Sequence, residues 1–167
     1  MEAWDLYNSQ GEYQGISIQR GETIPEGLFH RIIHVWIFNE RKEFLIQQRA
    51  LHLTWFPGRW ATTTGSVVSG ENDLELAAYR EVSEELGLKN TQIALEFEKE
   101  VFIGRSIVTI FKAFLPRYML QQVKINDEVA DVKWMKKSKI DELRSLHLFA
   151  EYSDETFNIV YPILDRS

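Results

Sequence analysis

A string of residues near the middle of the chain, Arg80 to Leu88, places three glutamates on what reads as one short helix. At about 3.6 residues per turn, Glu81 and Glu85 lie one above the other and Glu84 lies beside them, so their oxygens share one patch. Hard oxygen ligands of this kind suit Mg²⁺ or Mn²⁺. Like charges at this spacing repel one another, so the pattern favours a cation that completes the cluster. We therefore expect a metal site at Glu81, Glu84 and Glu85.

The alternative interpretation of this string is an ordinary solvated helix face. Helical periodicity argues against it, because at about 100° per residue Glu81 and Glu85 fall within roughly 60° of Leu74 and Ala78. The two carboxylates therefore continue the apolar stripe of the helix. Acids on the core-facing side of a helix are costly unless they are paired or metal-bound. The spacing predicts that they line a cleft.

Length and composition predict one domain that covers residues 1–167. With 167 residues, 44% hydrophobic and 13% aromatic, the chain can bury about 70% of its unfolded surface. It contains no run of about 18 apolar residues that would span a membrane, and the segment 1–5 lacks the pattern of a signal peptide. We expect a cytoplasmic protein with no membrane partner. The absence of cysteine excludes disulfides, thiolate zinc sites and a cysteine nucleophile.

The charge balance points to a small partner. A net charge of −6, from 19 basic and 25 acidic residues, argues against a nucleic-acid polymer, whose phosphate backbone requires a basic surface. A small phosphorylated substrate is compatible with an acidic protein, because a divalent ion neutralises phosphate locally. The sequence leaves a homodimer open.

The hydrophobic pattern predicts many short strands and few helices. Strands are expected where β-branched and aromatic residues cluster between turn residues, at 4–7, 15–19, 30–38, 43–48, 60–68, 94–102, 107–114 and 129–135. Helices are expected at 73–86, ended by Gly87, at 138–147, with Ser138 and Asp141 as a capping-box-like start, and near 153–164, where Pro162 interrupts the pattern. This order predicts an α/β (α+β) fold with a mixed sheet between helices.

The Arg80 to Leu88 string, Arg-Glu-apolar-x-Glu-Glu-x-Gly-apolar, resembles the second half of the signature of the Nudix hydrolases. In that family a Gly, five residues, a Glu and seven residues precede the Arg. Gly65 and Glu71 have the right mutual spacing, but eight residues separate Glu71 from Arg80. Either a one-residue bulge lets Glu71 still reach Arg80, the interpretation that we favour, or Asn72 takes the capping role and the first acidic position is lost.

The resemblance implies a Nudix-like α/β/α sandwich and a reaction. Nudix enzymes hydrolyse a diphosphate linked to another group with Mg²⁺ or Mn²⁺, which here would be held by Glu81, Glu84 and Glu85. The carbonyl that supplements these carboxylates would belong to Gly65, or to Thr64 if the shift runs the other way. Arg80 is expected to orient Glu71 or a neighbouring carboxylate through a forked ion pair.

Further segments resemble the Nudix branch that includes isopentenyl diphosphate isomerase, namely 36–39, 48–50, 56–60 and 125–129, followed by Trp134. The isomerase uses a cysteine and a histidine to move protons on a prenyl carbon, and Gly65 and Val67 stand at those positions here. The sequence therefore disfavours isomerisation. A third hypothesis is a module that senses a nucleotide without hydrolysing it, although a pure sensor has no need of three repelling acids.

Several residues outside the signature are candidates for the site. Glu128 lies where many Nudix hydrolases place an extra glutamate, so it is a candidate base or metal ligand beside Glu84, with an ordinary turn acid as the alternative. Glu98 and Glu100 could instead supply this distal carboxylate. His30 matches a metal-histidine position of the isomerase branch, but a hydrogen-bonded structural role is favoured.

Substrate contacts are expected from the segment that follows the fourth predicted strand. Arg49 and Arg59 are the candidate phosphate or base contacts. Trp55, beside a Pro-Gly turn, is the candidate pocket wall, and with Phe56 it could stack on a nucleobase. Trp60 is expected in the core. Nothing in the selectivity loops identifies the group attached to the diphosphate.

Overall fold

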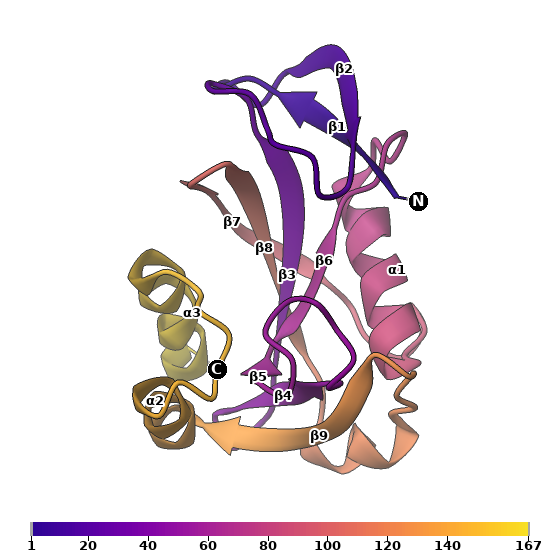
Figure 1. Cartoon of the computed structure of the whole chain (residues 1–167). Coiled ribbons are helices and arrows are strands. Elements are labelled where there is room, and N and C mark those ends of the chain that lie inside the picture. The colour runs from indigo at the N-terminus through magenta and orange to yellow at the C-terminus, as the bar shows by residue number, and fades with distance from the viewer. Residues whose placement is uncertain (1, 167) are drawn as a thin grey trace.

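The structure is a computed structural model that describes residues 2–166, and a mixed sheet forms its centre (Figure 1). The strands of this sheet follow the order β5-β4-β3-β8-β7, while β6 pairs with β3 and β9 pairs with β4. Their bounds are β3 His30–Phe38, β4 Glu43–Arg49, β5 Trp60–Ala61, β6 Thr63–Ser66, β7 Glu96–Ile103, β8 Ser106–Phe114 and β9 Val129–Lys136. A separate hairpin, β1 (Ala3–Tyr7) and β2 (Tyr13–Gln19), lies at one end of the sheet.

The central strand β3 makes the sheet mixed. It runs parallel to β8, from His30 opposite Ser106 to Phe38 opposite Phe114, and antiparallel to β6, where Ile33 pairs with Gly65. Strand β9 runs antiparallel to β4, and β7 and β8 form the antiparallel pair that the sequence predicts. The segment expected as one strand at 60–68 is two short strands, and Thr62 between them donates its hydroxyl to the Val35 carbonyl.

Helices cover both faces of the sheet, so the predicted sandwich is confirmed. Helix α1 (Leu74–Leu86) lies on one face, and helices α2 (Lys137–Ser145) and α3 (Asp154–Arg166) lie on the other (Figure 1). A short 3₁₀ helix, η1 (Arg117–Gln122), follows β8. Among the described residues no helix is long and apolar enough to cross a membrane.

The alternation of β3 divides the core into two halves. Ile33, Val35 and Ile37 pack with the apolar residues of α1, while Ile32 and Trp36 pack with those of α2 and α3. Successive side chains of a strand point to opposite faces, so one strand supplies both halves.

The helix ends follow the sequence in one case and not in another. Asp73 caps α1 by accepting from the Leu76 N–H at 3.1 Å, and Gly87 ends it at φ 65°, as expected of a left-handed C-terminal residue. The capping box expected at Ser138 and Asp141 is wrong. Helix α2 starts one residue earlier, after Lys136, and no side chain caps it. Helix α3 continues through Pro162 because its apolar face is buried on the sheet.

Candidate active site

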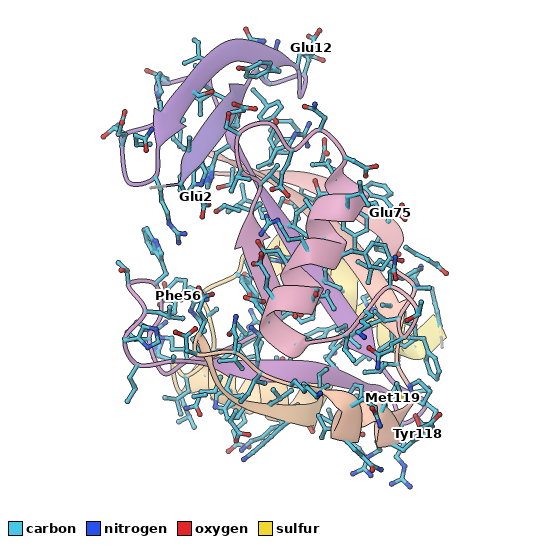
Figure 2. All side chains as sticks on the ribbon, turned by 90° about the vertical axis from the view of Figure 1, so that its right-hand side faces the viewer. Glu2, Glu12, Phe56, Glu75, Tyr118 and Met119 are labelled. Carbon is cyan, nitrogen blue, oxygen red and sulfur yellow. The ribbon has the colours of Figure 1, made fainter. Side chains whose placement is uncertain are left out.

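The three glutamates of α1 differ in exposure. Glu81 and Glu85 are 8% and 5% exposed and face the sheet, whereas the Glu84 side chain is 54% exposed. The periodicity argument is therefore confirmed for the first two. Figure 2 looks onto this helix, with Glu75 of its first turn pointing outward.

A chain of hydrogen bonds fixes Glu85 on the buried side of α1. The Gln47 amide of β4 donates to the Glu85 Oε1 at 3.2 Å, and the Thr63 hydroxyl of β6 donates to the Gln47 Oε1 at 3.2 Å. Burial raises the pKa of Glu85 well above its usual range, and the charges of Glu81 and Glu128 raise it further. The Gln47 hydrogen bond and the Arg49 charge oppose this rise. Burial thus favours the neutral form of Glu85 in this arrangement.

Glu81 lies between the backbone of β6 and Arg80. A Cβ placed on Gly65 would collide with the carboxyl group of Glu81, so only glycine leaves room for this carboxylate against the strand. The Arg80 Nη1 lies 3.0 Å from the Glu81 Oε1. Burial raises the pKa of Glu81 to about 7 although the Arg80 charge lowers it, and the Glu84 and Glu2 charges add to the rise.

The contacts of Arg80 show which residue fills the first acidic position of the signature. Its Nε and Nη2 donate to the two carboxylate oxygens of Glu71, both at 2.8 Å, which is the forked ion pair that the sequence predicts. Asn72 is exposed. Glu71 also accepts from the Val68 N–H at 2.9 Å. The irregular spacing is therefore accommodated before the helix, and Glu71 keeps its place.

The donor set suits a divalent ion, but Arg80 competes for it. Within residues 2–166, no three acidic or histidine side chains are gathered in a geometry that would hold a metal ion. Arg80 holds Glu81 at 3.0 Å and Glu84 at 3.3 Å instead. Carboxylates on adjoining turns are the oxygen ligands that Mg²⁺ prefers. Metal binding at this helix therefore requires these carboxylates to exchange their contacts with Arg80.

Two of the candidates outside the helix lie near Glu85. Both Arg49 and Glu128 act on its pKa through their charges, in opposite directions. Arg49 also donates from Nε to the Trp55 carbonyl at 2.6 Å, which ties the loop after β4 to the site. Glu128 is exposed, and its carbonyl accepts from the Ala50 N–H at 3.0 Å.

Of the remaining candidates, Arg59 is occupied elsewhere and the Trp55 side chain is exposed. Arg59 pairs with Glu151 at 3.1 Å and stacks over Phe56. Trp55 is 59% exposed, so it is open to a ligand, and Trp60 is half-buried against the core beneath α2 and α3, as expected.

The alternative acids and the histidine have structural partners. Glu98 pairs with Lys112 and Arg166 on the other edge of the sheet, and Glu100 pairs with Arg31 at 2.8 Å. His30 stacks on Trp4 at 4.2 Å and contacts the Ser106 hydroxyl at 2.9 Å. Burial lowers its pKa to about 4. These contacts favour the structural role for His30.

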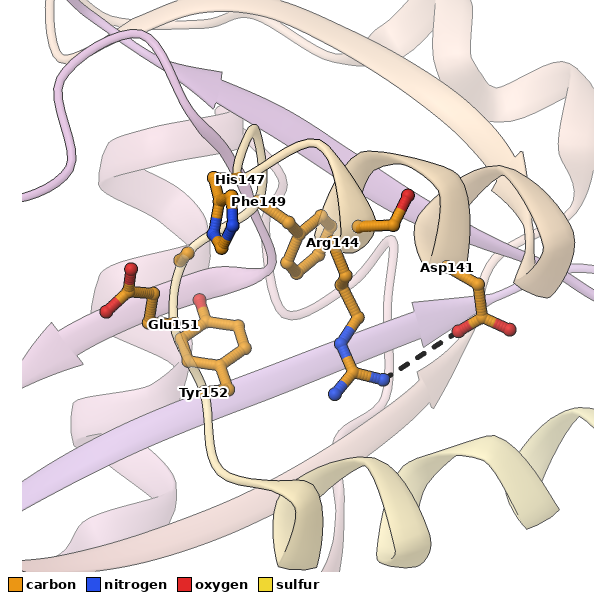
Figure 3. A pocket seen from close by; sticks show the side chains of 8 residues that line it. Asp141, Arg144, His147, Phe149, Glu151 and Tyr152 are labelled. Atoms are coloured by element: carbon orange, nitrogen blue, oxygen red, sulfur yellow. Dashed lines mark ion pairs between the residues drawn. The ribbon is translucent and has the colours of Figure 1, made fainter.

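The structure adds residues that no motif indicated. Gln47 and Thr63 read as ordinary strand residues, and only the pairing of their strands brings them to Glu85. Tyr152 is a further case. It lines an open hollow of about 500 Å³ beside α2 (Figure 3), and its hydroxyl lies 2.7 Å from that of Thr64, next to Gly65.

Comparison with known proteins supplies the family. The NUDIX domain model matches residues 28–156, which include the whole of α1 and the segment before it, residues 65–73, here called the leader of α1. The chain belongs to the Nudix family. An uncharacterized Nudix hydrolase of Listeria innocua is 36% identical over 157 residues, which cover 91% of this chain and 90% of that protein. This Nudix protein is thus an enzyme of the hydrolase type.

Two further matches fit the family. Isopentenyl-diphosphate Delta-isomerase of Rhodobacter capsulatus is 32% identical over 135 residues, which cover 77% of this chain and 74% of the isomerase. Among solved structures, DR0079 from Deinococcus radiodurans superposes with a TM-score of 0.75 at 19% identity and covers 99% of this chain and 98% of its own. The second match shows a shared fold alone.

Proposed function

We propose that this Nudix enzyme uses Mg²⁺ or Mn²⁺ to cleave a diphosphate bond in a small substrate, a nucleoside diphosphate linked to another group or a related compound. The observation that carries the proposal is the joint arrangement of Glu81 and Glu85, buried toward the sheet, with Gly65 packed against the first and Gln47 holding the second. Burial of two acids in this way is costly unless a cation stabilises them.

Glu81, Glu84, Glu85 and the Gly65 carbonyl are the proposed ligands. A bound divalent ion supplies charge stabilisation of the phosphoryl oxygens and lowers the pKa of a bound water. Glu71 and Arg80 do not touch the substrate in this scheme. Their forked pair fixes the first turns of α1 and offers Arg80 as the neutralising partner of Glu81 and Glu84 before the ion binds.

Glu84 and Glu128 are the proposed proton acceptors for the attacking water. Both are exposed, and the charge of Glu128 reaches Glu85. Arg49, on the same side, is the proposed phosphate contact, while Arg59 and Trp55 are proposed to contact the attached group. An unchanged rate for Glu128→Gln would remove Glu128 from the reaction.

Two other functions receive less support. The isomerase relative argues for a prenyl diphosphate, but Gly65 and Val67 stand where isomerisation needs a cysteine and a histidine, and neither can transfer a proton. A sensor without turnover would not need three acids on one helix. We also propose that residues 1–167 act as one Nudix domain, because the hairpin β1–β2 is hydrogen-bonded to the leader of α1.

A substrate screen tests the function directly. Nucleoside diphosphate sugars, dinucleotides, nucleoside triphosphates and prenyl diphosphates are incubated with the enzyme, with and without Mg²⁺, and the products are separated by chromatography and identified by mass spectrometry and NMR. We expect metal-dependent cleavage of at least one nucleoside diphosphate derivative. Tight binding of one compound without any turnover would favour the sensor, and a shifted double bond in isopentenyl diphosphate would favour the isomerase.

A further inference from the structure

The hairpin β1–β2 lies outside residues 28–156, the part that the family model matches, yet it lies against the leader of helix α1 (Figure 1). The Ser69 N–H donates to the Ala3 carbonyl at 2.8 Å. The hairpin is held in turn by the rest of the fold, since Leu6 is fully buried and Tyr7 pairs with Phe29.

One buried carboxylate joins the hairpin to this leader. Asp5 of β1 is 9% exposed. Its Oδ1 accepts from the Ser69 hydroxyl at 2.6 Å and from the Ser17 hydroxyl of β2 at 2.6 Å, and its Oδ2 accepts from the Gly70 N–H at 3.1 Å. Burial alone would raise the pKa of Asp5, but these hydrogen bonds outweigh it and lower the pKa. Asp5 is therefore a charged anchor for two consecutive residues of the loop.

The anchored residues immediately precede Glu71. Gly70 adopts φ 91°, in the left-handed region that favours glycine, and this turn directs Glu71 back toward the helix. Glu71 then receives two hydrogen bonds from Arg80 at 2.8 Å. Arg80 contacts Glu81 and Glu84 in turn. A continuous series of contacts therefore runs from Asp5 to the proposed metal ligands.

We propose that Asp5 is a positioning residue of the active site, which sets the Glu71–Arg80 pair and through it the carboxylates of Glu81 and Glu84. The inference rests on the proposed function for its effect on catalysis. The irregular spacing between Glu71 and Arg80 explains why this site would need such a positioning residue. With one extra residue before the helix, the signature does not fix the leader by itself, and an anchor from the hairpin does so.

The chain offers a matched pair of variants to test this. Ser17→Ala and Ser69→Ala each remove one hydroxyl that donates at 2.6 Å to the same oxygen of Asp5. Both serines are exposed. Only Ser69 belongs to the loop, so the two substitutions remove equal contacts of Asp5 but differ in whether they release the leader.

The first readout does not depend on turnover. The Arg80 Nε–H donates to Glu71, and its hydrogen exchange is measured by NMR on the full chain. We expect exchange about fivefold faster in Ser69→Ala and faster still in Asp5→Asn, with Ser17→Ala close to the unsubstituted protein. Equal exchange in the two serine variants would overturn the proposal, as would an Asp5→Asn protein that is folded by circular dichroism and exchanges at the original rate.

The second readout concerns the metal and the reaction. With Mn²⁺ alone as the probe, calorimetry is expected to give a dissociation constant on the order of tenfold higher in Asp5→Asn, with a lower kcat and little change in KM. An unchanged Mn²⁺ affinity would overturn the proposal. If the unsubstituted protein hydrolyses no diphosphate while the Arg80 exchange still separates the serine variants, the proposed function fails and the positioning role of Asp5 stands.

Discussion

The two faces of the sheet bury polar groups in opposite ways. On the α1 face, Glu81 and Glu85 are buried among partners that hold their oxygens, and burial raises the pKa of both. On the α2 and α3 face, His34 lies against the Tyr152 ring at 4.5 Å, and its Nδ1 has no hydrogen-bond partner among the described residues. Burial lowers the pKa of His34 to about 3, so this side chain is neutral. The first face buries two acids whose pKa is raised, and the second buries a neutral histidine inside an aromatic core.

The comparison predicts that substitutions on the α1 face reduce activity and spare stability. Replacing Glu84 and Glu85 together with Gln should lower kcat/KM on the order of a thousandfold, because the proposed charge stabilisation is lost. Gln47 can still contact a glutamine at position 85, so the fold should persist. Phosphate-release kinetics and thermal unfolding measure the two effects. Retained activity would disprove the role of the helix.

The opposite result is expected on the other face. Phe157 of α3 is 2% exposed and packs between Phe149 and the Arg144 guanidinium, which lies 3.7 Å from its ring. Phe157→Ala should lower the free energy of unfolding by about 3 kcal/mol through the cavity it leaves. The kcat of the folded fraction should stay unchanged. Urea denaturation and kinetics below the transition test this, and a large fall in kcat would show that the two faces are coupled.

The neutral state of His34 predicts a pH dependence of stability. Its pKa in the folded protein, about 3, is below the ordinary value of 6.5, so the unfolded chain takes up the proton first as the pH falls. The contribution of the neutral His34 to the free energy of unfolding is fully present above pH 6.5 and is lost as the pH falls toward 3. Between pH 7 and pH 5 this costs about 2 kcal/mol.

The variant His34→Leu isolates this contribution, since all other titrating groups are shared. The difference in unfolding free energy between the two proteins, from urea titrations at pH 7 and pH 5, should shift by about 2 kcal/mol in favour of the variant at the lower pH. A constant difference would mean that the pKa of His34 is the same in the folded and unfolded proteins.

The smallest expected effect concerns the leader of α1. Glu71→Gln removes the charge that faces Arg80 and should lower kcat about tenfold. Asn72→Ala alters the exposed neighbour and should leave kcat within about twofold. Steady-state kinetics with the substrate found by screening compares the two. Equal losses would restore the alternative in which Asn72 carries the first position.

Much of the fold could be predicted from local patterns. Strands at 30–38 and 129–135 follow from β-branched and aromatic runs, and α1 follows from Asp73, the apolar stripe and Gly87. The capping box at Ser138 failed because helix α2 starts earlier, where no side chain caps it. Strand β9 ends at Lys136 and the helix follows it directly, so the start of α2 is set by the strand and not by the Ser138 motif.

Some residues of the candidate site could also be predicted from local sequence patterns, and others could not. The positions of Glu81 and Glu85 follow from the period of a helix, and the pairing of Glu71 with Arg80 follows from a known signature. Gln47, Thr63 and Asp5 could not be found in this way, because each reaches its partner only through contacts between strands and loops distant in sequence. Their residue types carry no signal without the fold.

The parallel pairing of β3 with β8 has a consequence for how the protein forms. Helix α1 depends on local contacts, so it can form early, whereas residues 30–38 meet residues 106–114 only after most of the chain is available. Strand β9 also comes late in the chain, and its Val132 pairs with Gln47 of β4. Helix α1 can therefore form before the sheet is complete. A chain arrested before residue 106 would carry the whole signature and still lack the strands that complete the sheet beside β3 and β4.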